Sequence, residues 1–199
     1  MKRAALGIQM HSGWGLVVAA SGAIKSIEIL DRRRIVTADP AIVGTKQPYH
    51  HASQLELAEA EEYLANCTAT SSRMASMAIQ ELVRELEGRR YRILGASVLL
   101  ASGRPLPPVA KILASHPLIH TAEGEFFRHA ARRGCEDLQI PVTAIREREL
   151  DKQAEAAFGN GASRLRASIA TIRNSIGPPW TKDHKTAALA AALILAGAQ

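Results

Sequence analysis

Three short apolar runs at the start of the chain constrain its fold more than any other feature. Ala4–Met10 and Trp14–Ala20 are separated only by the turn His11–Gly13, and the turn Ser21–Gly22 leads into a third run, Ile24–Val36. Connections this short join antiparallel neighbours, because parallel strands need a crossover of a dozen or more residues. The first 36 residues therefore predict a three-stranded antiparallel meander.

Helical and apolar segments alternate after the meander. A loop rich in breakers, Thr37–His51, precedes a helix that we expect to begin at Ser53, where Ser53 and Glu56 fit a capping box. The polar stretch Thr68–Ser72 predicts a kink or a break in this helix. Tyr91–Leu100 is then continuously apolar enough to predict a buried, parallel strand.

The second half of the chain predicts one more strand among several helices. Helical character is expected over Glu123–Arg133, with Gly134 ending the helix, and Leu138–Ile145 predicts a strand in which Pro141 indicates an edge position or a bulge. The last helix is expected over Thr181–Leu195. No repeat or linker divides the sequence, so we expect residues 1–199 to form a single domain.

Composition indicates an ordinary globular protein. Hydrophobic residues make up 47% of the 199 residues, and the longest apolar run, Ala187–Ala198, has 12 residues, against about 20 for a membrane span. No signal peptide is recognisable, so we expect a cytoplasmic protein without membrane partners. Cys67 and Cys135 follow no metal or redox spacing and are expected to be reduced thiols.

The order of elements resembles that of ribonuclease H-like folds, which include Holliday-junction resolvases of the RuvC type. Leu6–Trp14 is similar to the family's first hairpin, and Asp183–Ala192 is similar to its final helix, in which an acidic residue precedes an Ala-rich face. The resemblance implies an α/β fold with a central mixed sheet of about five strands, three antiparallel and then two parallel, flanked by helices. It also implies that the Ala-rich helix lies close to the sheet.

The same resemblance implies where an active site would lie, and the sequence departs from it. Such enzymes use two divalent ions about 4 Å apart, held by carboxylates from the first strand, the fourth strand and the last helix. Here Gln9 stands at the first-strand position, Arg92–Leu100 contains no acid, and only Asp183 matches. Asp183 is therefore the one candidate catalytic residue, and a single carboxylate could not hold two dications.

A second group of candidate metal ligands lies elsewhere in the sequence. His116, His120, Glu123 and Glu125 fall within ten residues, and imidazole with carboxylate suits zinc or manganese if a turn gathers them. The spacing matches no structural zinc pattern, and acids at a helix start are also explained by the helix dipole. The pair His50–His51 is expected in a solvated loop. The metal candidates are thus Asp183, Glu123, Glu125 and His120.

The basic residues offer a candidate nucleic-acid surface. The net charge is +6, and 18 of the 25 basic residues are Arg, which pairs phosphate in bidentate fashion. An Arg-rich composition with ordinary solvated faces explains the same excess. Clustering of the arginines on one face with the cleft would favour nucleic acid, and scattering would favour a regulatory protein that assembles and binds no nucleic acid. The candidates are Arg32, Arg33, Arg34, Arg89, Arg90, Arg132 and Arg133.

Three functions remain open at the level of sequence. The leading hypothesis is a ribonuclease H-like protein without two-metal nuclease activity that acts by binding, with DNA or RNA as the candidate partner. The second is a divergent metal-dependent nuclease or phosphotransferase that uses Asp183 with acids such as Glu123 or Glu125, and with magnesium or manganese; otherwise no cofactor is expected. The third is a regulatory protein that assembles, for instance as a homo-oligomer, through its Ala-rich helices.

Overall fold

A five-stranded mixed sheet lies at the centre of the molecule. The computed structural model describes the chain apart from residues 24–25, 102–104 and 198–199. Within this part the strand order is β3-β2-β1-β4-β5. The first three strands are antiparallel neighbours, and β4 and β5 run parallel to β1. The predicted fold class is confirmed, and β1 is the middle strand of the sheet. The strands are β1 (Lys2–His11), β2 (Trp14–Ser21), β3 (Glu28–Val36), β4 (Tyr91–Leu100) and β5 (Val142–Arg146).

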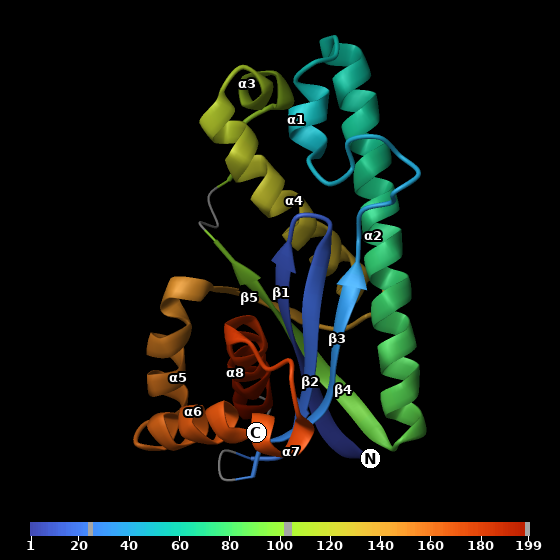
Figure 1. Ribbon diagram of the computed structural model, residues 1–199. Coiled ribbons are helices and arrows are strands. Elements are labelled where there is room, and N and C mark those ends of the chain that lie inside the picture. Colours follow the sequence, from blue (N-terminus) through green and yellow to red (C-terminus); the bar gives the residue numbers. More distant parts are fainter. Residues whose placement is uncertain (24–25, 102–104, 198–199) are drawn as a thin grey trace.

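Helices cover both faces of this sheet. The long helix α2 and helix α4 pack on one face, and α8, flanked by α5 and α6, packs on the other (Figure 1). No described helix is long and apolar enough to cross a membrane. The helices are α1 (Pro48–Ala52), α2 (Leu57–Gly88), α3 (Val109–Leu113), α4 (His116–Glu136), the 3-10 turn η1 (Glu147–Glu149), α5 (Leu150–Phe158), α6 (Gly161–Thr171), α7 (Arg173–Ile176) and α8 (Lys182–Gly197).

Successive residues of β1 face opposite sides of the sheet, and the core accordingly has two halves, one on each side. Leu6 and Ile8 point into the cluster that α2 and α4 complete, while Gly7 lies under α8. A Cβ atom on Gly7 would sit 1.8 Å from the carbonyl oxygen of Ala187, so only glycine lets the helix approach so closely. The close approach expected for the Ala-rich helix is therefore present, and it carries the first turn of α8 to the end of β1.

Some helices extend beyond the sheet and form what we call the helical head, made of α1, α3 and the first turns of α2 and α4 (Figure 1). Its buried residues form two small clusters of helix and loop side chains without any strand residue. The head therefore depends on contacts among its own helices and loops, together with Tyr49, which also packs against the main core beside Phe126. The clusters centre on Ala52, Ala60 and Leu64, and on Ile112, Ile119 and Ala122.

Helix starts differ from those predicted. Helix α2 begins at Leu57 instead of Ser53, because Pro48 in the first turn starts a separate helix, α1, within the expected loop. The Ser53 hydroxyl donates to the carbonyl of His50, at the end of α1, and forms no capping box. Helix α2 then continues through Thr68–Ser72 without a break, and α4 begins at His116, with Pro117 in its first turn, ahead of the predicted Glu123.

The region around Gly134 also differs from the prediction. Helix α4 continues through Gly134 to Glu136, because this glycine is a contact point with α2 and not a helix stop. Strand β5 accordingly begins at Val142 instead of Leu138. Pro141 precedes it at the sheet edge, where its carbonyl accepts a hydrogen bond from the amide of Ala96. The predicted start of the third strand, Ile24, lies outside the described residues.

Candidate functional site at the carboxyl edge of the sheet

The carboxyl ends of β1, β4 and β5 lie at the same end of the sheet, because these three strands are parallel. We call this end the carboxyl edge of the sheet. The first turn of α8 lies at the same edge. Gln9 and His11 come from the end of β1, Glu147 follows β5 directly, and Lys182 and Asp183 begin α8. This edge therefore gathers the positions at which the resemblance implies an active site.

Gln9 and Glu147 contact one another at the centre of the site. Gln9 is buried, and its Nε2 donates to Glu147 Oε2 at 3.4 Å. The other Glu147 oxygen, Oε1, lies 3.5 Å from Nζ of Lys182. Gln9 Oε1 is buried without a hydrogen-bond partner among the described residues. The Glu147 carboxylate is thus already shared between an amide and an ammonium group.

Asp183 belongs to a second, adjoining group. Its Oδ2 lies 3.1 Å from Nε2 of His11, and the His11 ring stacks on Trp14 with centroids 4.3 Å apart. The guanidinium of Arg34 lies over the Trp14 ring, 4.3 Å from its centroid. The carboxylate that the resemblance singled out is therefore paired with a histidine, and Arg34 adds a positive charge at the Trp14 end of the same stack.

Strand β4 adds no ligand to this edge. Ser97 is paired with Gly7, and Leu99 packs into the core under α8. The Ser97 hydroxyl is fully buried and has no hydrogen-bond partner among the described residues. An apolar side chain and a small hydroxyl therefore occupy the positions at which a carboxylate would be needed.

These residues do not fit a pair of divalent cations. Two dications near one another repel strongly, and carboxylates are what offset that repulsion. The edge offers Glu147 and Asp183, the first bound by Gln9 and Lys182 and the second by His11. Among the described residues, the group of three or more ligands close enough to share an ion lies elsewhere in the molecule.

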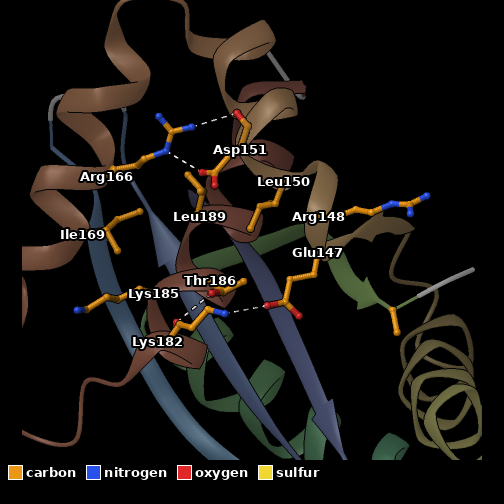
Figure 2. Close-up of a pocket in the computed structure, with 11 residues that line it drawn as sticks. Glu147, Arg148, Leu150, Asp151, Arg166, Ile169, Lys182, Lys185, Thr186 and Leu189 are labelled. Atoms are coloured by element: carbon orange, nitrogen blue, oxygen red, sulfur yellow. Dashed lines mark hydrogen bonds and ion pairs between the residues drawn. The ribbon is translucent and has the colours of Figure 1, made fainter. Parts of the chain in front are cut away.

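A cavity of about 640 Å³ opens beside this group, between α8, α5 and α6 (Figure 2), and we call it the α8 cleft. Lys182 points toward Glu147 and Arg166 toward Asp151, while Arg148 and Lys185 extend outward to opposite sides. Arg166 is further bound to Glu155. The lining residues are Ala101, Glu147, Arg148, Leu150, Asp151, Arg166, Ile169, Lys182, Lys185, Thr186 and Leu189, of which four are cationic and two acidic.

The rim of the α8 cleft carries cations that are available to a ligand. The side chains of Lys182 and Arg148 are 83% and 73% exposed. Among the described residues, the ion-pair partner of Arg148 is Glu149, at 4.0 Å, and Lys185 is exposed without such a partner. Exposed pairs of this kind are worth little, so a phosphate could replace them at small cost.

The arginines proposed from the sequence do not form one surface. Arg32 donates to the carbonyls of Ile176–Pro179, and Arg33, on the opposite side of β3, binds Asp31 and Glu85. Arg89 donates to the carbonyl of Leu30. Of the seven, Arg34 lies on Trp14 beside the candidate site, and the charge of Arg32 is near enough to lower the pKa of His184 at the start of α8.

The remaining three arginines lie on other elements. Arg90 is exposed in the turn before β4, where its φ is +62°. Arg132 and Arg133 are exposed on α4, and both are close to Glu136. The sequence clusters therefore scatter over β3, the α2–β4 turn and α4, and several of these guanidinium groups stabilise the fold itself.

The metal candidates of α4 lie on the other side of the sheet from Asp183. Helix α4 packs into the core half that contains Ile8, whereas α8 packs into the half that contains Leu99. Glu123 binds His50, and Glu125 lines a different cavity beside Arg128. The structure does not bring Glu123, Glu125 or His120 to Asp183.

Two residues of these groups are not identified by the sequence. Glu147 could have been found, because it directly follows a strand predicted to be parallel to the first, and the carboxyl ends of parallel strands share one edge. The prediction that His50 lies in a solvated loop is wrong: it lies in α1, partly buried against Glu123. Nothing in the spacing of His50 and His116 indicates that the two residues are neighbours in space.

Comparisons with known proteins show the fold. RuvC of Thermus thermophilus, in complex with a Holliday junction substrate, superimposes with a TM-score of 0.53 at 12% identity, over 98% of this chain and 94% of that chain. A second Thermus thermophilus RuvC structure gives 0.52 at 12% identity, with the same coverage. No family model and no curated protein matches the sequence. The fold is thus ribonuclease H-like, and the resemblance noted in the sequence is confirmed at this level.

Proposed function

We propose that this ribonuclease H-like chain binds nucleic acid at the carboxyl edge of its sheet and does not cleave it by two-metal catalysis. The phosphate backbone would contact the rim of the α8 cleft, through Arg148, Lys182 and Lys185. The observation that carries the proposal is the buried amide at the centre of the site: Gln9 donates to Glu147, where the chemistry of cleavage would need free carboxylates.

Charge supports binding at this edge. Anionic ligands are attracted to exposed Lys and Arg, and the rim has three such side chains, on the first turns of α8 and just after the end of β5. Arg34 on Trp14 extends the cationic edge toward β3. The structural neighbour in complex with a Holliday junction makes branched DNA the first ligand to test.

Binding is tested by titrating labelled four-way junction, duplex, single-stranded DNA and RNA–DNA hybrid with the protein at several salt concentrations. We expect weak, salt-dependent binding, in which each phosphate contacted contributes about −0.9 to the slope of log affinity against log salt for duplex DNA. The triple variant Arg148→Gln, Lys182→Gln and Lys185→Gln should lower affinity. Its slope should become shallower by about 0.9 for each phosphate that the protein no longer neutralises.

A matched control removes three positive charges from surfaces outside the α8 cleft. The triple variant Arg90→Gln, Arg132→Gln and Arg133→Gln alters three exposed arginines on other elements, and it should retain most of the affinity. Equal losses in both triple variants would contradict a site at the α8 cleft. Absence of binding to every nucleic acid at low salt would contradict the proposed function as a whole.

Cleavage is tested with the same labelled substrates and magnesium or manganese. We expect none from the wild-type protein, because Gln9 contributes a neutral amide and β4 contributes no carboxylate. Cleavage that disappears in Asp183→Asn would contradict this part of the proposal and favour the metal-dependent enzyme. Activity gained in Gln9→Asp would indicate that the first-strand substitution alone separates the chain from catalysis.

A second candidate function rests on the scatter of the arginines. Because most of the seven sequence candidates bind groups within the fold, their abundance does not require a nucleic-acid partner. A regulatory protein that assembles with copies of itself would account for that pattern. Sedimentation at several protein concentrations distinguishes it: self-association together with no nucleic-acid binding would favour this second function.

A further inference from the structure

Three histidines converge in the helical head, on the face of the sheet opposite the α8 cleft. His116 and His120 are one turn apart on α4, so their side chains share one face of the helix. His50 reaches them from α1, which packs against α4 (Figure 1). One nitrogen of each ring can be chosen so that all three lie within 4.8 Å of one another.

We propose that His50, His116 and His120 form a transition-metal site, with zinc as the ion that the ligands fit best. Imidazole nitrogens suit zinc, copper, nickel and iron, whereas magnesium and calcium require oxygen ligands. Nitrogens bound at about 2.0–2.1 Å to a tetrahedral zinc lie about 3.4 Å apart, so small torsional changes would close the present separation. This inference is independent of the proposed nucleic-acid function.

Glu123 supplies the second observation that points to an ion. Its Oε1 accepts hydrogen bonds from Nδ1 of His50 at 3.1 Å and from the His50 amide at 3.0 Å. With the proton on Nδ1, the lone pair of His50 is on Nε2, which is the form that binds a metal. A carboxylate that orients a ligating histidine in this way is a recurrent outer-shell partner in zinc sites.

The burial of Glu123 makes this arrangement informative. Its side chain is only 7% exposed, and Oε2 is buried without a hydrogen-bond partner among the described residues. A buried carboxylate is costly unless positive charge is near, and a metal ion on the far nitrogen of His50 would supply that charge.

The exposure of the cluster indicates an open site. His116 and His120 are exposed and His50 is half-buried, so a fourth coordination position would face solvent. Zinc sites with three protein ligands and one exchangeable position bind water or an anionic ligand there, in contrast to closed structural sites with four protein ligands. The ligand class for the fourth position is therefore water or a small anion.

The test uses untagged full-length protein, because a polyhistidine tag would supply competing imidazoles. After treatment with a chelator, the protein is titrated with Co²⁺ and Zn²⁺, and binding is followed by the visible spectrum of Co²⁺ and by calorimetry. We expect one ion per chain, a spectrum typical of four-coordinate Co²⁺, and displacement of Co²⁺ by Zn²⁺. Affinity should fall as the pH is lowered, because protons compete with the metal ion for the ligand nitrogens.

Variants separate a built site from scattered surface imidazoles. His116→Ala and His120→Ala should each lower affinity by more than about 100-fold, whereas loss of an outer-shell partner in Glu123→Gln should cost about 10–100-fold. His129→Ala removes an exposed imidazole from the same helix, outside the cluster, and should leave affinity unchanged.

Two results would overturn the proposal: no saturable binding of either ion by the wild-type protein, or binding by His116→Ala and His120→Ala that equals that of wild type. Because both histidines are exposed, these variants remain decisive even if the buried Glu123→Gln change prevents folding. Zinc should also raise the melting temperature of the wild-type protein and of His129→Ala, but not that of His120→Ala.

Discussion

His184 is a buried imidazole at the start of α8, next to the candidate site. Its Nδ1 accepts hydrogen bonds from the amide of Thr181, at 3.2 Å, and from the Thr181 hydroxyl, at 2.8 Å, while the ring of Trp180 lies against it. Burial lowers its pKa, helped by the positive charge of Arg32 and opposed by Asp183. The neutral ring therefore caps the start of the helix, and protonation of Nδ1 would remove the acceptor of the Thr181 amide.

This environment predicts a pH-dependent stability. Because the pKa is lower in the folded state, the unfolded chain binds the proton first, and stability falls as the pH drops below about 6.5, the usual value for histidine. One proton can contribute a slope of at most about 1.4 kcal/mol per pH unit. Urea unfolding of wild type and His184→Gln from pH 8 to pH 5 measures it. The variant should lose part of the slope; identical slopes would contradict a neutral, buried His184.

Helices α2 and α4 are in close contact at Gly134. A Cβ atom there would lie 2.8 Å from the amide nitrogen of Ser76 and 3.0 Å from backbone and side-chain atoms of Ala75. Because the obstructing atoms include the backbone of another helix, rotation of a side chain cannot relieve the contact. The glycine is thus required by the neighbouring helix and not by the conformation of its own.

Substitution at this contact should destabilise the protein. Gly134→Ala forces the two helices apart, and we expect a loss of about 1–3 kcal/mol, as for other overpacked sites. Gly88→Ala is the matched control, because nothing lies within 4 Å of its Cβ position at the end of α2; it should be neutral or stabilising by up to about 1 kcal/mol. Denaturant unfolding of both variants gives the comparison. Equal stabilities of the two would refute the packing argument.

The elements differ in how far the sequence determines them. The sequence predicts strands β1, β2 and β4 closely, because continuous apolar runs between turn residues have few alternatives. The predicted end of α4 is wrong, since a glycine that serves as a helix contact has the same local signal as a glycine that stops a helix. Resemblance alone places Gln9 and Asp183 at one edge, whereas the contacts of Glu147 and His50 depend on tertiary packing that local patterns do not encode.

At the scale of the whole molecule, the sheet keeps two candidate sites apart. The α8 cleft lies on the face covered by α8, and the histidine cluster lies in the helical head, beside the opposite half of the core. No described residue belongs to both groups. Substitutions in one site should therefore leave the other intact, and this is why the two sets of experiments can succeed or fail separately.

The length of α2 affects which part of the molecule unfolds first. Its 32 residues span about 48 Å, whereas a ten-residue strand such as β1 spans about 33 Å. The helix therefore extends beyond the sheet, and its first turns form part of the helical head. The two small clusters of the head bury mostly Ala, Leu and Ile, with no strand to anchor them. Such a region can unfold as a cooperative unit of its own while the sheet persists.

Native-state amide hydrogen exchange would reveal this unit. We expect amides of α1, α3 and the first turns of α2 to exchange through openings of lower free energy than those of β1 and β4, whose protection should report global unfolding. An ion bound between α1 and α4 would couple these segments and slow their exchange selectively. Uniform protection across head and sheet would contradict this view. The chain would then unfold in a single cooperative step, whereas the architecture predicts a stable sheet and a helical head that opens more often.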